Sequence, residues 1–278
     1  NKNCLIEKLK QKTIKSTRNV REYAKKYIGK IENLSDEEMA DILEESARLQ
    51  AQCMTDGTII AFADIYGEIT NSLLAIIKRR GNLKCPHHVY TNVLGSPSEK
   101  SLTQQAYLTI QKGNKNNQNL LTDYYWLDQG YIGRGLTNEQ LEKIKKESKQ
   151  KEDLPTAGEL FEELNLTDDE QRVFFVSQEV IVIKSLRADS RQFLHVVNNR
   201  MADVLAGRWN LEPRLVESMY AHEITKVLRG SQKIPRDLEN RWTHSIFLHT
   251  KELTKYKVLS GAKADKFIKA NVIREKLG

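Results

Sequence analysis

Apolar and polar positions repeat at helical spacing along most of the chain, and the stretch 171–206 stands out. It contains neither glycine nor proline, and its first part, 172–187, is the most apolar segment of a polar protein. Its β-branched residues would also fit two short strands, but Ser177-Gln-Glu between them is no turn. The length without a breaker favours one helix. The pattern therefore predicts a buried helix over 171–206.

The first turns of this predicted helix are apolar nearly all round. Val176, Val180 and Ile183 share one face. Four more apolar residues cover most of the other side: Phe174, Phe175, Ile181 and Val182. A helix of this kind needs neighbours on every side, so we expect it inside a bundle of helices.

Beyond the apolar turns the same face becomes cationic. Arg187 and Arg191 continue it at steps of four, and Lys184 lies beside them. Buried or half-buried cations are costly unless they are paired or hydrogen-bonded. The stripe therefore implies either carboxylate partners such as Glu179 and Asp189, or solvent, or an anionic ligand, and the sequence leaves these open.

Helical spacing recurs on both sides of this segment. A capping-box signal begins at Ser35, which is followed three residues later by Glu38, and Thr137-Asn-Glu-Gln is expected to open a charged helix. The expected helices are 3–30, 36–55, 58–80, 96–107, one opening at Thr137, and one that contains Leu238 and Trp242. Gly57 is expected to separate the second from the third, and Gly207 to end the long helix.

Composition points to the same fold class. Glycine (14) and proline (5) are scarce, so we expect an all-α protein, a multi-helix bundle with little or no sheet. The length allows one large domain or two helical lobes. Leu154-Pro155 is the expected boundary, with an N-terminal lobe over 1–153 and a C-terminal lobe over 154–278 around the 171–206 helix.

Charge and cysteine content narrow the function classes. The net charge of +7 is concentrated in residues 1–30 and 251–278, while the middle of the chain has an acidic excess. Basic ends on an acidic body do not form one continuous phosphate-tracking surface, so nucleic-acid binding is disfavoured. Cys4, Cys53 and Cys85 form no pairing pattern, and no apolar run is long enough for a membrane span, which favours the cytoplasm. The chain begins at Asn1, and we expect a piece of a longer protein.

Three motifs suggest ligand sites without completing one. Asp64 and Glu68 lie one helical turn apart, but no second carboxylate pair accompanies them, and we expect no metal there. Cys85-Pro-His-His lacks the further ligands of a zinc site, which has about four. The glycines of 130–135 follow no evident strand and match no nucleotide-binding motif. The aromatic residues before them either wall a ligand site or pin a loop to the core through Trp126.

From about residue 120 onward, five segments carry a family resemblance. They are Tyr124-Tyr-Trp-Leu, Leu166-Thr-Asp-Asp-Glu-Gln-Arg, Lys184-x-x-Arg187, Met201-Ala-Asp-Val-Leu-Ala with Tyr220-Ala-His-Glu-Ile, and Val258-Leu-Ser-Gly-Ala-Lys-Ala. In this order they resemble the central helical region of the PEP-utilising phosphotransferases, a group that includes phosphoenolpyruvate synthase and rifampin phosphotransferase. The N-terminal third matches only in helical character.

The resemblance implies a division of labour. In that family an ATP-grasp domain phosphorylates a swivelling histidine domain, which carries the phosphoryl group to an acceptor, held in rifampin-type members by a mostly helical middle domain. This sequence resembles that middle piece and has neither a Gly-rich ATP-grasp loop nor a phosphohistidine segment. We therefore expect it to be inactive by itself, without a cofactor, because ATP and magnesium belong to other domains of the parent enzyme.

The same resemblance implies partners and a candidate site. The partners are the flanking ATP-grasp and phosphohistidine domains and an anionic or small-molecule acceptor. The implied site residues are the cationic stripe and the candidate walls of an acceptor pocket: Lys184, Arg187, Arg191, Tyr125, Trp126 and Arg134. Two alternatives stay open, a helical protein-interaction scaffold and a nucleic-acid-binding module that uses the basic termini.

Overall fold

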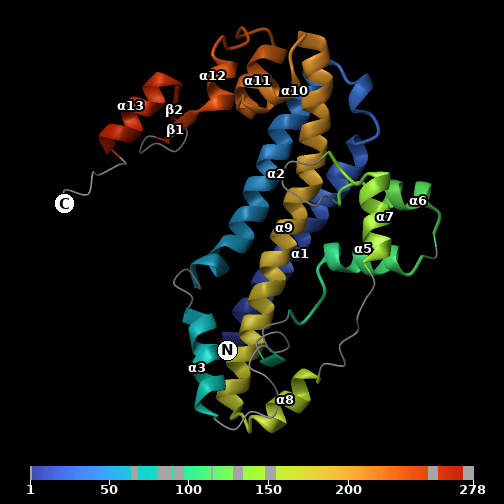
Figure 1. The fold of residues 1–278 in the computed structure, drawn as a ribbon, viewed down its shortest axis with the longest axis vertical. Helices are drawn as coiled ribbons and strands as arrows, with labels where there is room; N and C mark the ends of the chain where they lie inside the picture. The colour runs from blue at the N-terminus through green and yellow to red at the C-terminus, as the bar shows by residue number, and fades with distance from the viewer. Residues whose placement is uncertain are drawn as a thin grey trace. The chain divides into compact units, whose positions relative to one another are not determined.

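A computed structural model describes residues 2–63, 68–80, 89–90, 97–113, 115–127, 134–147, 155–249 and 256–271 of the chain. Its described elements, shown in Figure 1, are nearly all helices. In chain order they are α1 (Lys2–Tyr27), the short 3₁₀ helix η1 (Ile31–Asn33), α2 (Asp36–Ala63), α3 (Glu68–Arg79), α5 (Leu102–Gln111), α6 (Asn117–Asp123), α7 (Asn138–Lys146), α8 (Ala157–Glu163), α9 (Asp168–Trp209), α10 (Pro213–Glu217), α11 (Ala221–Leu228), α12 (Leu238–Thr243), β1 (Ser245–His249), β2 (Tyr256–Ser260) and α13 (Ala262–Asn271). The predicted all-α class is confirmed.

The small sheet is the one departure from helix in the described ranges. β1 and β2 pair antiparallel, with Ser245 opposite Ser260 and His249 opposite Tyr256. Two strands of five residues each leave the protein in the all-α class. They agree with the sequence prediction of little or no sheet.

The long helix predicted over 171–206 is confirmed as α9, which spans 42 residues. Thr167 caps it, because its hydroxyl accepts from the Glu170 backbone N–H at 3.4 Å and its own N–H donates to the Glu170 carboxylate at 3.0 Å. The expected end at Gly207 is wrong by a few residues. The helix continues to Trp209 and stops at Asn210, whose φ of 51° is the left-handed conformation that terminates helices.

One prediction about the faces of α9 is also wrong. Phe174 is completely buried, but the next side chain, Phe175, is 52% exposed. Consecutive helical residues point about 100° apart, so a helix packed on one broad side leaves one of them outside. α9 is therefore half-buried at its start rather than surrounded.

α2 runs without interruption through Gly57, where the sequence pattern predicted a break. Glycine there serves a close approach instead of a helix end. A Cβ atom at this position would lie 2.2 Å from Cδ of Arg187, a residue of α9. The predicted helix over 58–80 is thus the end of α2 followed by α3, and residues 64–67 between them lie outside the described part of the chain.

The helix starts follow local signals closely. Ser35 and Glu38 form the predicted capping box, and the helix expected to open at Thr137 begins with a capping box of Thr137 and Gln140. The helix expected from residue 96 begins later, at Leu102, because Ser101 accepts from the Gln104 backbone N–H and is the N-cap.

The Cα positions divide the chain into two compact units. Unit 1 combines Asn1–Ile28 with Ser46–Val197, and unit 2 combines Gly29–Glu45 with Asn198–Gly278. The boundary predicted between residues 153 and 154 falls among residues that are not described.

Unit 1 contains two apolar clusters centred on α9. One holds Phe174 with residues of α3 and α8: Leu73, Ile76, Ile77, Leu160 and Leu164, together with Tyr90 and Leu166. The other holds Val180 and Ile183 against Leu9 of α1, with Val176 packed on it. The face that the sequence predicted as core is therefore buried, at Val180 and Ile183 most fully.

Unit 2 is held partly by ion pairs. Arg229, just after α11, reaches three carboxylates on one face of α2, with separations of 2.6–3.1 Å to Glu37, Asp41 and Glu44. Arg241 of α12 pairs with Glu223 of α11 at 2.7 Å, and both side chains are about nine-tenths buried. In the described ranges, no helix combines the length and apolar character that crossing a membrane requires.

Candidate functional site

The cationic stripe lies on α9 within unit 1, as its spacing predicted. Lys184 is exposed, and Arg187 and Arg191 are half-buried. The expected carboxylate partners are engaged elsewhere. Glu179 binds Lys10 of α1 at 2.8 Å, and Asp189 faces the start of α5.

Asp189 is a buried carboxylate that binds the start of α5. It accepts from the Leu102 backbone N–H at 2.8 Å and from the Thr103 hydroxyl at 2.6 Å, so it binds the orphan donors at the start of α5. Burial raises the pKa of Asp189 above its usual value, although these hydrogen bonds favour the charged form. This carboxylate is therefore not a counter-ion for the stripe.

Arg187 is held against α2 by neutral groups. Its Nη1 donates to the Gly57 carbonyl at 3.3 Å, and its Nη2 lies 3.7 Å from the Met54 sulfur. Its Nε is buried and has no hydrogen-bond partner among the described residues. In that part of the chain no carboxylate pairs with Arg187, and its guanidinium is positioned by the Gly57 carbonyl and the Met54 sulfur.

The predicted aromatic wall is part of the core. Trp126 is only 3% exposed, and its ring lies 4.5 Å from the Phe193 ring on α9. The Leu136 backbone N–H donates to the Tyr125 carbonyl at 3.1 Å, and a Cβ atom at Gly135 would lie 2.3 Å from that same oxygen. This segment fits the alternative reading, a loop pinned to the core through Trp126.

The structure describes only some of the remaining candidate residues. Arg134 is exposed, while residues 128–133, which include Gly130 and Gly133, lie outside the described residues. Asp64 and Cys85-Pro-His-His also fall outside them. Across the described ranges there is no group of three or more His, Cys, Asp or Glu side chains placed to hold a metal ion.

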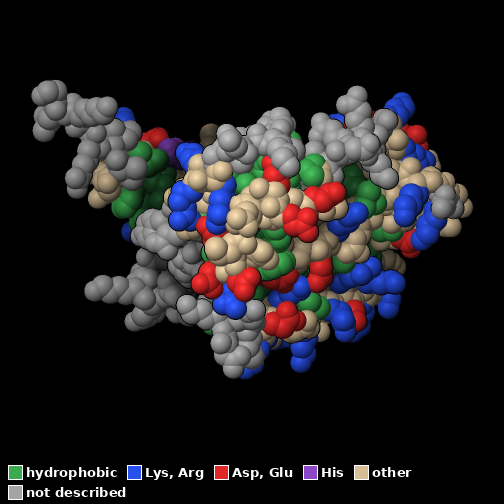
Figure 2. Space-filling view, turned by 90° about the horizontal axis from the view of Figure 1, so that it is seen from below, with side chains coloured by type: hydrophobic (Ala, Val, Ile, Leu, Met, Phe, Trp, Pro, Cys, Tyr) green, Lys and Arg blue, Asp and Glu red, His purple; other side chains and the backbone are tan. Residues whose placement is uncertain are grey.

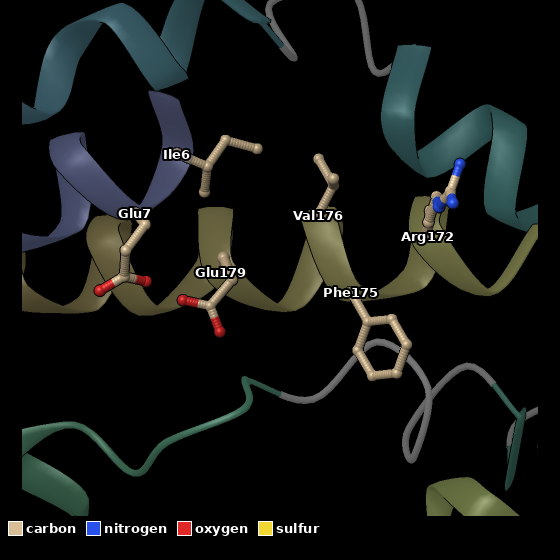
Figure 3. A pocket seen from close by; sticks show the side chains of 6 residues that line it. All are labelled: Ile6, Glu7, Arg172, Phe175, Val176 and Glu179. Carbon is tan, nitrogen blue, oxygen red and sulfur yellow. The ribbon is translucent and has the colours of Figure 1, made fainter. Parts of the chain in front are cut away.

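Sequence reasoning missed a cavity between α1 and α9, shown in Figure 3. Its volume is about 270 Å³, and its lining combines apolar with charged side chains: Ile6, Glu7, Arg172, Phe175, Val176 and Glu179. The signal that could have found it is the pair Phe174-Phe175, because a helix packed on one side buries only one of two consecutive aromatic residues.

An ion-pair cluster stands beside this cavity. Lys10 is mostly buried, and its ammonium contacts Glu179 at 2.8 Å and Glu99 at 2.5 Å. Burial opposes the charge on Lys10, but the hydrogen bonds to Glu179 and Glu99 outweigh it and raise the pKa. The polar edge of the cavity is therefore fixed, whereas Phe175 in its lining leaves apolar surface in solvent. Leu5 of α1 is also exposed, at 61%.

No protein-family model, curated protein or solved structure matches this chain.

Proposed function

We propose that the chain is a non-catalytic helical domain, acceptor-binding or spacer, of a cytoplasmic PEP-utilising or ATP-dependent phosphotransferase. The observation that carries the proposal is the environment of Arg187. A guanidinium positioned by a carbonyl and a sulfur keeps its charge for an anion, and a phosphoryl group in transfer is stabilised by fixed positive charge.

The placement of the resembling segments agrees with this proposal. Leu166-Thr-Asp-Asp-Glu-Gln-Arg opens α9, Lys184-x-x-Arg187 lies within it, and Tyr220-Ala-His-Glu-Ile begins α11. Val258-Leu-Ser-Gly-Ala-Lys-Ala covers the end of β2 and the start of α13. Helices of this kind suit a domain that holds an acceptor while another domain moves.

The first test is the coding sequence on either side of these residues. We expect an ATP-grasp segment upstream and a histidine carrier segment downstream. The isolated chain, incubated with radiolabelled ATP or phosphoenolpyruvate, should remain unlabelled, while the complete protein should label its carrier histidine. If the upstream sequence encodes no ATP-grasp segment and the downstream sequence encodes no histidine carrier segment, the proposal is contradicted.

The second test separates acceptor binding from a spacer role. In the complete protein, Arg187→Gln should leave labelling of the carrier histidine unchanged and slow transfer to the acceptor by on the order of 100-fold. Lys12→Gln is the matched control, because Lys12 is an exposed cation of α1 in the same unit. If both variants transfer at the wild-type rate, the acceptor-binding role is wrong and the spacer role is left.

A helical interaction scaffold is the second candidate, favoured by the exposed Phe175 at the cavity of Figure 3 and by Leu5, which is exposed on α1. For a scaffold that self-associates through this surface, sedimentation velocity should show concentration-dependent association of the wild type that Phe175→Ser abolishes. A nucleic-acid module has less support, because Figure 2 shows acidic and basic side chains interspersed on the face in view.

A further inference from the structure

A second cavity lies within unit 2, between the segment that joins α10 to α11 and the end of α12. Its volume is about 300 Å³, and Glu217, Met219, Tyr220, Arg241 and Trp242 are among the residues that line it. None of these belongs to the cationic stripe of α9, so an inference from this cavity is independent of the proposed function.

The lining offers aromatic faces to a ligand. The Trp242 side chain is 48% exposed although tryptophan is costly to leave in water, and Tyr220, also in the lining, is half-buried. Met219 is 7% exposed and contributes apolar surface. Burial raises the pKa of the Tyr220 phenol, and the nearby Glu223 charge adds to this, so its ring keeps a neutral hydroxyl. Aromatic faces carry negative partial charge and attract organic cations, with tryptophan the strongest.

Among the residues that line the cavity and the carboxylates that contact Arg241, acidic side chains outnumber cations. Arg241 is the one cation among its lining residues, and it is already engaged. Its Nη1 contacts Glu223 at 2.7 Å, and its Nε lies 3.1 Å from an Asp237 carboxylate oxygen. Two carboxylates thus surround one guanidinium, and a third, that of Glu217, lies in the lining and has a contact of its own. An anion is disfavoured here, whereas a cation meets both the carboxylates and the π faces.

We propose that this cavity binds an alkylammonium group, a protonated or quaternary amine on a short apolar stem. The ammonium lies over the Trp242 ring with Glu217 and Tyr220 beside it, and the stem packs on Met219. The shared chemistry fits either a free small amine or the side chain of a lysine, including a methylated lysine, on a partner protein.

The test compares choline with its uncharged isostere, in which carbon replaces the quaternary nitrogen. Two NMR reporters line the cavity, the Trp242 indole N–H and the Met219 methyl group, and the indoles of Trp126 and Trp209 serve as internal references. At millimolar concentrations choline should shift the two reporters and bind roughly two- to thirtyfold more tightly than the isostere.

Variants and further ligands complete the design. Trp242→Leu, followed through Met219, should reduce choline affinity to that of the isostere, while Trp242→Tyr should retain part of it, and both should fold because Trp242 is half-exposed. Equal affinity for choline and the isostere, no shift with either, or a Trp242→Leu affinity equal to wild type overturns the proposal. A capped trimethyllysine that binds more tightly than choline assigns the site to a partner's side chain, and the reverse order assigns it to a free amine.

Discussion

Gly57→Ala is the sharpest test of how α9 is held against α2. Alanine in the middle of a helix ordinarily stabilises by about 1 kcal/mol relative to glycine. Here the new methyl group would lie 2.2 Å from Cδ and 2.6 Å from Cγ of Arg187, so the stem of that side chain must leave its place. Overpacking of this kind costs about 1–3 kcal/mol, which exceeds the gain in helix propensity. We expect a net loss of about 1 kcal/mol of unfolding free energy.

The sign should reverse when Arg187 is removed. An Arg187→Ala background removes the three atoms nearest to the new methyl group, so Gly57→Ala should stabilise there by about 1 kcal/mol. The double-mutant cycle then gives a coupling energy of about 2 kcal/mol between the two positions. Gly158→Ala is a control in the same unit, because the nearest atom to its new Cβ is 3.9 Å away.

Urea unfolding followed by Trp126 fluorescence measures these energies, in a background where Trp209 and Trp242 are replaced by phenylalanine. Trp126 is buried in unit 1 and therefore reports on that unit. If Gly57→Ala stabilises equally with and without Arg187, the close approach of the two helices is wrong. The neutral environment assigned to Arg187 would then be wrong with it.

Three further predictions concern unit 2. Arg241→Met leaves the Glu223 carboxylate buried without its partner and should lower the free energy of urea unfolding by about 3–5 kcal/mol. Adding Glu223→Gln should recover part of this loss. Additive losses from the two substitutions would contradict the ion-pair account. Burial lowers the pKa of His222 below 6.5, so as the pH falls the unfolded chain binds this proton before the folded chain does. The contribution of His222 to stability should be complete above pH 6.5 and fall below it, by at most about 1.4 kcal/mol per pH unit. In thermal unfolding at a series of pH values, His222→Gln should flatten that slope. Arg229→Ala should destabilise the protein slightly at low salt and have almost no effect in about 1 M NaCl, because its three carboxylate partners are exposed. A loss of stability that persists in salt would argue for packing instead.

Local signals in the sequence determined the elements of this protein. A run without glycine or proline forms α9, and polar caps followed three residues later by Glu or Gln start helices at Ser35 and Thr137. These signals are local because a helix satisfies its backbone hydrogen bonds within itself, and its first turn needs only a nearby acceptor. The spacing of Lys184, Arg187 and Arg191 likewise placed them along one side of α9 before any neighbour was known.

Only the tertiary structure decided what each face meets. Phe174 and Phe175 are identical in the sequence pattern, yet one is core and the other half-exposed, because that depends on where α3 and α8 lie. Gly57 resembles a helix break but makes room for Arg187, whose position depends on a helix more than 100 residues away in the chain. Helical periodicity determines which residues share a face. Contacts between distant segments determine what that face packs against and whether a charge on it is paired.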